Sequence, residues 1–288
     1  MPGPTIAAAL VLASLGSGDR ASMEPGVVAQ PTEEHARLRL VAPTRGLVAG
    51  DTNYLGLLFD IDPEWHIYWD GLNDSGFAPN AEWTAPPGVE VGEIIWPAPH
   101  RYVAPGDVLD HVYEERVLLL VPVEVPRGAR AGSMLTFRAQ TEWLVCKDVC
   151  LPGFGDVRLT LPVVEAGSDN APTEFASAFE AAWARVPLDG AVLDDPRVRV
   201  RLSGSSVEID ARGARRLSYY PQNEAARIEE PIRRGVSTSG HLRLRRSPYD
   251  RGSVSRDPVV RFVIEADFGG DEPPLIVRVE RPLSELGG

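Results

Sequence analysis

The 288-residue sequence predicts a mainly β protein, built as an immunoglobulin-like β-sandwich followed by a connecting helix and a second β-rich domain. Short runs in both halves alternate apolar and polar residues with a period of two, the pattern of half-buried strands. Turn clusters separate these runs, and the 27 glycines and 26 prolines follow no Gly-X-Y period. This composition indicates a loop-rich β protein rather than a helical bundle.

The first β domain is expected over residues 34–165. The expected strands are Ala36–Val41, Tyr54–Ile61, Arg116–Val123, Met134–Val145 and Val157–Leu161. Between them lie turn clusters rich in Gly, Pro, Asn and Asp, for example at 70–80 and 104–107. Many short strands with long connections are typical of an immunoglobulin-like sandwich.

A linker and one helix are expected over residues 166–189. Phe175, Phe179 and Trp183 recur every four residues, so they share one face of a helix that ends before Pro187. Such an aromatic stripe is more often a packing face than a cofactor site, and we expect it to dock against a sandwich.

The second β domain is expected over residues 190–285. Its expected strands are Val198–Leu202, Val207–Ala211, His241–Arg245, Val259–Ala266 and Leu275–Val279. It has no cysteine and a single histidine, so the sequence indicates no chemistry there.

The charge balance argues against a nucleic-acid-binding protein, since 29 basic and 41 acidic residues give a net charge of −12. The apolar run Ile6–Leu15 has ten residues, too few for a bilayer, which needs about 20. We interpret residues 1–22 as a signal peptide, although the first basic residue, Arg20, follows the run. A disordered tail and a misplaced start are the alternatives. The protein is therefore expected to be periplasmic or secreted, and either soluble or only peripherally attached to a membrane.

The two cysteines, Cys146 and Cys150, are separated by three residues. If these residues form a hairpin turn, the cysteines face each other at a separation that permits a disulfide. A structural staple is one interpretation, but closing a five-residue loop contributes only about 2 kcal/mol, against about 4.7 kcal/mol for a 100-residue loop. Redox exchange explains the short spacing better.

Lys147, the chain's only lysine, lies between the cysteines and would favour a thiolate, while Asp148 and Glu142 oppose it. The sequence leaves the net effect open. A zinc or copper site is less favoured, because the pair would need a distant histidine. The candidates are His66, His100 and His111.

An aromatic cluster, Trp65–Trp69, precedes a polar loop at 70–79. The Asp74-Ser75-Gly76 sequence superficially matches a serine-protease nucleophile loop, but the His, Asp, Ser order of such an enzyme is absent. We interpret the loop as a cover over a neighbouring site; a rigid surface loop is the alternative.

Five segments in chain order together resemble the N-terminal periplasmic domain of the DsbD thiol:disulfide interchange family, particularly its ScsB-like branch. They are WHIYW (65–69), NDSG (73–76), AEWTAPPGVEVGEIIWPAPHR (81–101), HVYEE (111–115) and WLVCKDVC (143–150). The resemblance covers residues 36–165. More weakly, Tyr219-Tyr220-Pro221 is similar to the second extracytoplasmic segment of ScsB-like proteins.

The resemblance implies an immunoglobulin-like module that acts as a protein-disulfide reductase-type electron relay. Its cysteine pair would pass electrons from a membrane-embedded donor to oxidised periplasmic thioredoxin-like proteins, with the later cysteine meeting the partner. No cofactor and no metal are implied, and the family's settings are cytochrome c biogenesis and copper tolerance. A cap loop would cover the pair. The residues expected to form or modulate it are Phe77, Leu72, Lys147, His66, Tyr68 and Tyr113.

The chain departs from the family pattern in three places. Gly71-Leu72-Asn73 stands where relatives have Asn-Pro-Gly, His111-Val112-Tyr113 replaces a YGY-like element, and the cysteines are closer together than in well-studied relatives. Relatives continue into a transmembrane and a thioredoxin-like domain, so we expect this chain to use an electron donor in trans. The alternative functions are a binding or assembly module with a structural hairpin disulfide, and a copper or zinc carrier.

Overall fold

The computed structural model describes residues 34–190, 197–203, 206–222, 228–245 and 259–282. The predicted signal peptide lies outside these residues. No helix in the described part of the chain is long and apolar enough to cross a membrane.

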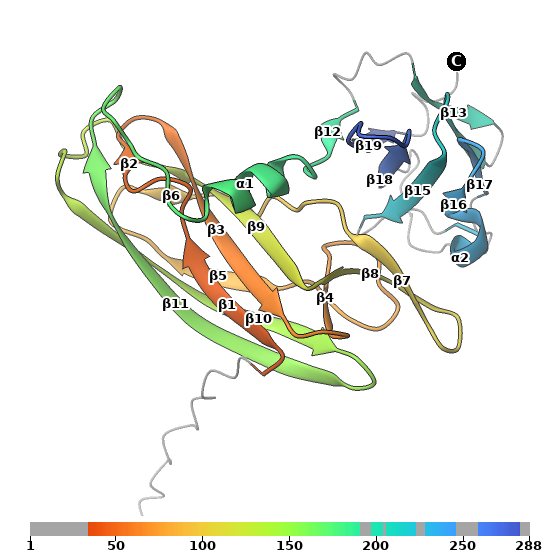
Figure 1. Cartoon of the computed structure of the whole chain (residues 1–288), viewed down its shortest axis with the longest axis horizontal. Helices are drawn as coiled ribbons and strands as arrows, with labels where there is room; N and C mark the ends of the chain where they lie inside the picture. Colours follow the sequence, from red (N-terminus) through yellow and green to blue (C-terminus); the bar gives the residue numbers. More distant parts are fainter. Residues whose placement is uncertain (1–33, 191–196, 204–205, 223–227, 246–258, 283–288) are drawn as a thin grey trace, which may run out of the picture. The chain divides into compact units, whose positions relative to one another are not determined.

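The first β region is a sandwich of two sheets, as the alternation predicts (Figure 1). One sheet has the order β1 (Ala36–Val41), β3 (Thr52–Ile61), β9 (Arg116–Glu124), β6 (Glu90–Val91). The other has the order β2 (Leu47–Val48), β11 (Cys150–Val164), β10 (Met134–Cys146), β4 (His66–Tyr68), β8 (Val108–Glu114), β7 (His100–Ala104), and β5 (Asn80–Thr84) also pairs with β10.

The sandwich core lies between the two sheets. Trp143 of β10 is 1% exposed and contacts Phe59 of β3 edge to face, with ring centroids 5.2 Å apart. The strands β3 and β9 are buried on both faces, because their outer face is covered by the helix α1 (Ala176–Trp183). Burial on both faces explains why both strands read as nearly continuous apolar runs.

The helix α1 docks on the sandwich through the aromatic stripe seen in the sequence. Phe179 is 3% exposed and packs with Leu118 and Leu120, and Phe175 lies against the same cluster. Trp183 stays 39% exposed. The expected packing face is therefore present, with its last aromatic at the edge.

The second β region contains two further sheets. One has the order β12 (Leu188–Asp189), β19 (Leu275–Pro282), β18 (Val259–Asp267), β15 (Arg216–Pro221), β16 (Val236–Ser237). The other has the order β13 (Val198–Ser203), β14 (Ser206–Ala211), β17 (His241–Arg245), and a short helix α2 (Pro231–Arg234) precedes β16. Their inner faces share one apolar cluster, which includes Ile209, Leu217, Leu242, Phe262 and Val277. The predicted fold class is confirmed.

Candidate functional site

The two cysteines form a disulfide at the tip of the β10–β11 hairpin. The two strands pair antiparallel from Met134 opposite Pro162 up to Cys146 opposite Cys150, so the bond closes the last rung of a long ladder. Their Cα atoms are 4.2 Å apart. Cys146 is 2% exposed, whereas Cys150 is exposed. An incoming reagent therefore reaches Cys150 first.

The burial of Cys146 comes from its place in the sheet. It lies between Cys150 on one side and His66 of β4 on the other. Its side chain belongs to a small apolar cluster with Tyr68 and Val112, against which Tyr102 of β7 packs. Neighbouring strands thus cover one sulfur and leave the other at the surface.

His66 is buried beside this cluster. It is 2% exposed, and its ring lies 4.5 Å from the Tyr102 ring and 5.4 Å from the Tyr68 ring, measured between centroids. Burial lowers the pKa of His66, although the charges of Asp110 and Glu114 oppose the shift. The imidazole is accordingly neutral at pH 7.

The loop at 70–79 is held against β8 by its own polar side chains. Because β4 ends at Tyr68, the middle of β8 lacks strand partners on that side, and the loop supplies them. The Asn73 Oδ1 atom accepts the backbone N–H of His111 at 2.7 Å, and the Asp74 Oδ2 atom accepts that of Leu109 at 2.8 Å. These bonds hold the Asn73 and Asp74 part of the NDSG segment against β8.

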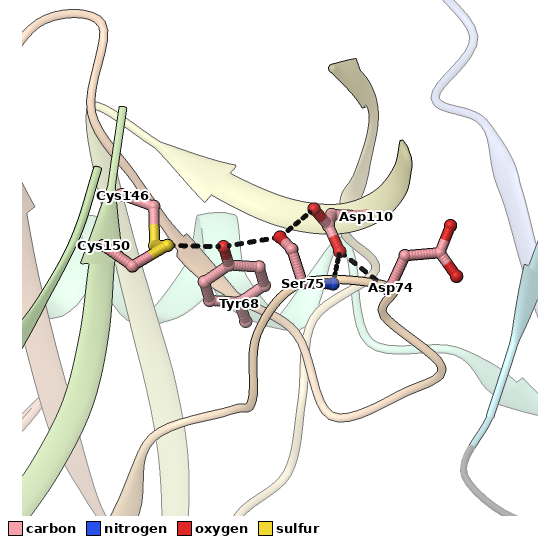
Figure 2. Close-up of a disulfide and its surroundings, with 6 residues drawn as sticks. All are labelled: Tyr68, Asp74, Ser75, Asp110, Cys146 and Cys150. Atoms are coloured by element: carbon pink, nitrogen blue, oxygen red, sulfur yellow. Dashed lines mark hydrogen bonds between the residues drawn. A yellow bond between two sulfur atoms is a disulfide. The ribbon is translucent and has the colours of Figure 1, made fainter. Parts of the chain in front are cut away.

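A row of polar groups leads from this loop to the disulfide (Figure 2). The buried carboxylate of Asp110, 1% exposed, accepts the backbone N–H groups of Asp74 at 2.9 Å and Ser75 at 3.0 Å on one oxygen. Its other oxygen accepts the Ser75 hydroxyl at 2.6 Å. The Ser75 Oγ atom lies 3.1 Å from the Tyr68 hydroxyl oxygen, which lies 3.5 Å from the Cys150 Sγ atom.

Tyr68, at the centre of this row, is fully buried. Burial raises the pKa of its hydroxyl, so it is protonated at neutral pH. Gly76 packs directly on the ring, since a Cβ atom there would lie 2.2 Å from a ring carbon. The glycine of NDSG thus fixes the loop against the tyrosine that contacts Cys150.

Lys147 lies in the exposed hairpin turn and pairs with Glu64. The Nζ atom is 2.7 Å from the Glu64 Oε2 atom, and this hydrogen bond raises the pKa of the lysine and lowers that of the glutamate. The lysine charge that the sequence placed beside the sulfurs is therefore largely offset by a carboxylate.

The remaining predicted cap residues lie in different surroundings. Phe77 is 53% exposed. Leu72 is half-buried, and its carbonyl oxygen accepts the Nδ1–H of His111 at 2.7 Å. Tyr113 packs in the main sandwich core and donates its hydroxyl to the Pro97 carbonyl oxygen. Their roles in covering the disulfide stay predictions.

Sequence reasoning missed three residues of this site: Ser75, Tyr102 and Asp110. Asp110 carried a readable signal, because a lone carboxylate between Leu109 and His111 in an apolar run breaks the expected pattern. Its partner Ser75 lies 35 residues away, and no spacing rule joins the two.

Comparisons with known proteins give one family-model match and several similar solved structures. Residues 37–162 match the family model described as "Thiol:disulfide interchange protein DsbD, N-terminal". The N-terminal periplasmic domain of ScsB from Proteus mirabilis is similar in fold, with a TM-score of 0.55 and 16% identity over 89% of this chain and 96% of that one. The reduced DsbD N-terminal domain from Neisseria meningitidis also matches, with a TM-score of 0.28 and 14% identity over 50% of this chain and 93% of that one.

No curated protein sequence matches the chain. The family match covers the five segments that carry the resemblance in the sequence and includes both cysteines. The chain therefore contains a DsbD N-terminal-like domain, formed by residues 37–162.

Proposed function

We propose that the protein performs extracytoplasmic thiol–disulfide exchange through Cys146 and Cys150. In this role it accepts electrons from a membrane-embedded donor and passes them to oxidised periplasmic thioredoxin-like proteins. The observation that carries the proposal is the asymmetry of the disulfide, with one cysteine 2% exposed and the other at the surface. A family match over residues 37–162 supports the same chemistry.

In the loading step, a donor thiolate attacks the Cys150 Sγ atom. A mixed disulfide forms, the Cys146–Cys150 bond breaks, and Cys146 leaves as a thiolate. The donor's second thiolate then attacks the donor sulfur that is bonded to Cys150 in the mixed disulfide. Cys150 is released as a thiolate. The donor becomes a disulfide, the pair gains two electrons, and each new thiolate takes a proton from water.

In the unloading step, the Cys150 thiolate attacks a client disulfide. The client's bond breaks and a new mixed disulfide forms, which the Cys146 thiolate then resolves by attacking the Cys150 Sγ atom. The pair is oxidised again and the client carries two thiols. Cys146 suits the resolving role because it is buried directly beside Cys150 and out of the partner's reach.

A structural clasp is the competing function. The ladder from Met134 to Cys146 already pairs every residue of β10 with β11, so the hairpin does not depend on the bond for its register. On the chain-entropy model, closing this short loop adds only about 2 kcal/mol. The disulfide is therefore poorly placed as a staple.

Titration of the pair against glutathione or dithiothreitol tests the proposal. We expect a reduction potential above about −300 mV, the range of exchange-active disulfides. A potential well below that value would identify a structural clasp and contradict the exchange function. Tight binding of Cu(I) or Zn²⁺ by the reduced protein, together with failure to exchange, would favour the metal-carrier alternative.

A further inference from the structure

Beside Cys150, hydrogen bonds connect Tyr68 to Ser75 and Ser75 to Asp110, and we call these three residues the row. The Asp110 carboxylate determines which group donates in each bond. An ionised carboxylate only accepts hydrogen bonds, so the Ser75 hydroxyl donates its one hydrogen to Asp110. The Ser75 Oγ atom must then accept the hydrogen of the Tyr68 hydroxyl, 3.1 Å away. It follows that the Ser75 and Tyr68 hydroxyl hydrogens both point toward Asp110 and away from the disulfide, along the contacts drawn in Figure 2.

This direction determines what Tyr68 offers to the sulfur. With its hydrogen engaged by Ser75, the Tyr68 hydroxyl turns a lone pair toward the Cys150 Sγ atom, 3.5 Å away. After reduction, the Cys150 thiol can donate its S–H to that lone pair, whereas a thiolate would meet a lone pair and a nearby buried carboxylate. Both effects favour the thiol.

We propose that Asp110 is a positioning residue that acts through Ser75 and Tyr68 to hold reduced Cys150 in its thiol form. The inference rests on the proposed exchange function and describes how the reactivity of reduced Cys150 is regulated. A thiol is a poor nucleophile, so the loaded pair would resist small oxidants and alkylating agents while it waits for a partner. A docking partner that moves the loop at 70–79 would release the Tyr68 hydroxyl to donate to the sulfur instead.

Other charged or titratable groups lie near the pair and stay unchanged in the test below. Lys147 and Asp148 belong to the hairpin turn, and Lys147 is paired with Glu64. His66 and Tyr102 pack beside the buried Cys146. Because they are constant, a change in reactivity between the variants reports on the row from Asp110 to Tyr68.

The variant Asp110→Asn reverses the direction of hydrogen-bond donation along the row, while the side chain keeps its size and shape. The amide oxygen still accepts the backbone N–H groups of the loop, but the amide nitrogen donates to Ser75. Ser75 then donates to Tyr68, and Tyr68 donates to the sulfur, which stabilises a thiolate. Reactivity should therefore rise when the carboxylate is removed, the opposite of what a general base at Asp110 would give.

The experiment measures the alkylation rate of Cys150 by iodoacetamide at pH 7, in full-length protein carrying Cys146→Ser. We expect Asp110→Asn to raise the rate about three- to tenfold, because the rate follows the thiolate fraction. Ser75→Ala, which frees the Tyr68 hydroxyl, should raise it by less. Glu82→Gln, which removes an exposed carboxylate on β5 away from the loop and the cysteines, should change it by less than about twofold.

A double variant separates the row from simple charge removal. In a Tyr68→Phe background the gain from Asp110→Asn should fall below about twofold, since no hydroxyl remains to be reoriented. A gain that persists in full would overturn the role of Ser75 and Tyr68, and a rate that is unchanged or lower in Asp110→Asn would overturn the proposal. If Asp110→Asn does not fold, the alkylation rate of Ser75→Ala decides the question. A rate that does not rise in Ser75→Ala would overturn the proposal.

This outcome is distinguishable from failure of the exchange function itself. The same variants can be mixed with an oxidised thioredoxin-like protein, and formation of a mixed disulfide can be followed on a non-reducing gel. Absence of any mixed disulfide would contradict the exchange function, while the order of alkylation rates would still report on the row.

Discussion

The disulfide end of the sandwich and the second β region place their polar groups in opposite ways. At the disulfide end, His66, Asp110 and His111 are each at most 2% exposed. In the described part of the second region, the buried polar residues are two serines, Ser206 and Ser218. Burying an ionisable group is unfavourable unless it is compensated. The two histidines and the aspartate therefore distinguish the disulfide end, since the ionisable side chains buried in the described part of the second region include only hydroxyl groups, those of Tyr219 and Tyr220.

The charges of the second region are instead spread over an exposed sheet face. Across β13, β14 and β17, Arg201 forms an ion pair with Asp210 at 2.7 Å, and the His241 Nδ1 atom lies within hydrogen-bonding distance of the same carboxylate, also at 2.7 Å. Ion pairs of this kind contribute little to stability. In the second region, apolar and polar residues thus alternate as in a sheet with one solvent-exposed face. The sandwich departs from this alternation near the cysteines.

The largest expected effect tests whether the two regions differ in stability or only in chemistry. Trp143→Ala in the sandwich core and Phe262→Ala in the second core should each cost about 3–5 kcal/mol, because each removes a large buried ring. Denaturant unfolding measures both losses. Only Trp143→Ala should also change the rate at which a small thiol reduces the disulfide.

A Phe262→Ala protein with an altered reduction rate would break this comparison, since it would show that the disulfide responds to the second region as well.

A smaller effect concerns acid stability at the disulfide end. Burial lowers the pKa of His111 to about 4, below the ordinary value of 6.5. The unfolded chain therefore binds the proton more readily, and stability is lost as the pH falls from about 6.5 to 4, by about 3 kcal/mol. His111→Asn keeps an N–H donor for the Leu72 carbonyl oxygen and should remove that part of the pH dependence.

The free energy of unfolding, measured at pH 7 and pH 4 for both proteins, checks this. An equal loss in wild type and His111→Asn would show that other groups cause the acid sensitivity.

The smallest expected effect concerns the cap. If Phe77 shields the sulfurs, Phe77→Ala should raise the alkylation rate of the reduced protein, but only a few-fold because the side chain is already 53% exposed. Mass spectrometry after timed alkylation measures the rate. An unchanged rate in a folded variant would remove Phe77 from the cap and leave Leu72 as the next residue to test.

Most strands were predictable because apolar and polar residues alternate in their sequences, and buried and exposed side chains alternate in the same way in the structure. The observed bounds of β1 and β17 equal the predicted ranges, and β9 and β10 differ by one residue. The strand β11 begins at Cys150, seven residues earlier than predicted, and runs through Pro152 and Gly153. Gly153 is needed there, since its backbone lies against the Trp143 indole.

The site was predictable where it is local in sequence and not where it depends on contacts between distant segments. The cysteine spacing indicated the disulfide, and the resemblance carried by the WHIYW segment implied that Tyr68 lies near it, as it does in the structure. The Ser75–Asp110 contact joins a loop to a strand 35 residues on, and it depends on β4 ending early at Tyr68. No local pattern encodes where a neighbouring strand stops.

The most direct test of the central claim is a trapping measurement with single-cysteine variants. Cys146→Ser and Cys150→Ser proteins would each be mixed with an oxidised thioredoxin-like protein, and the covalent complex would be quantified on a non-reducing gel. The exposure of Cys150 predicts that Cys146→Ser accumulates a reductant-sensitive complex and that Cys150→Ser does not. Equal trapping by both variants would contradict the assignment of the two sulfurs, and trapping by neither would contradict thiol–disulfide exchange itself.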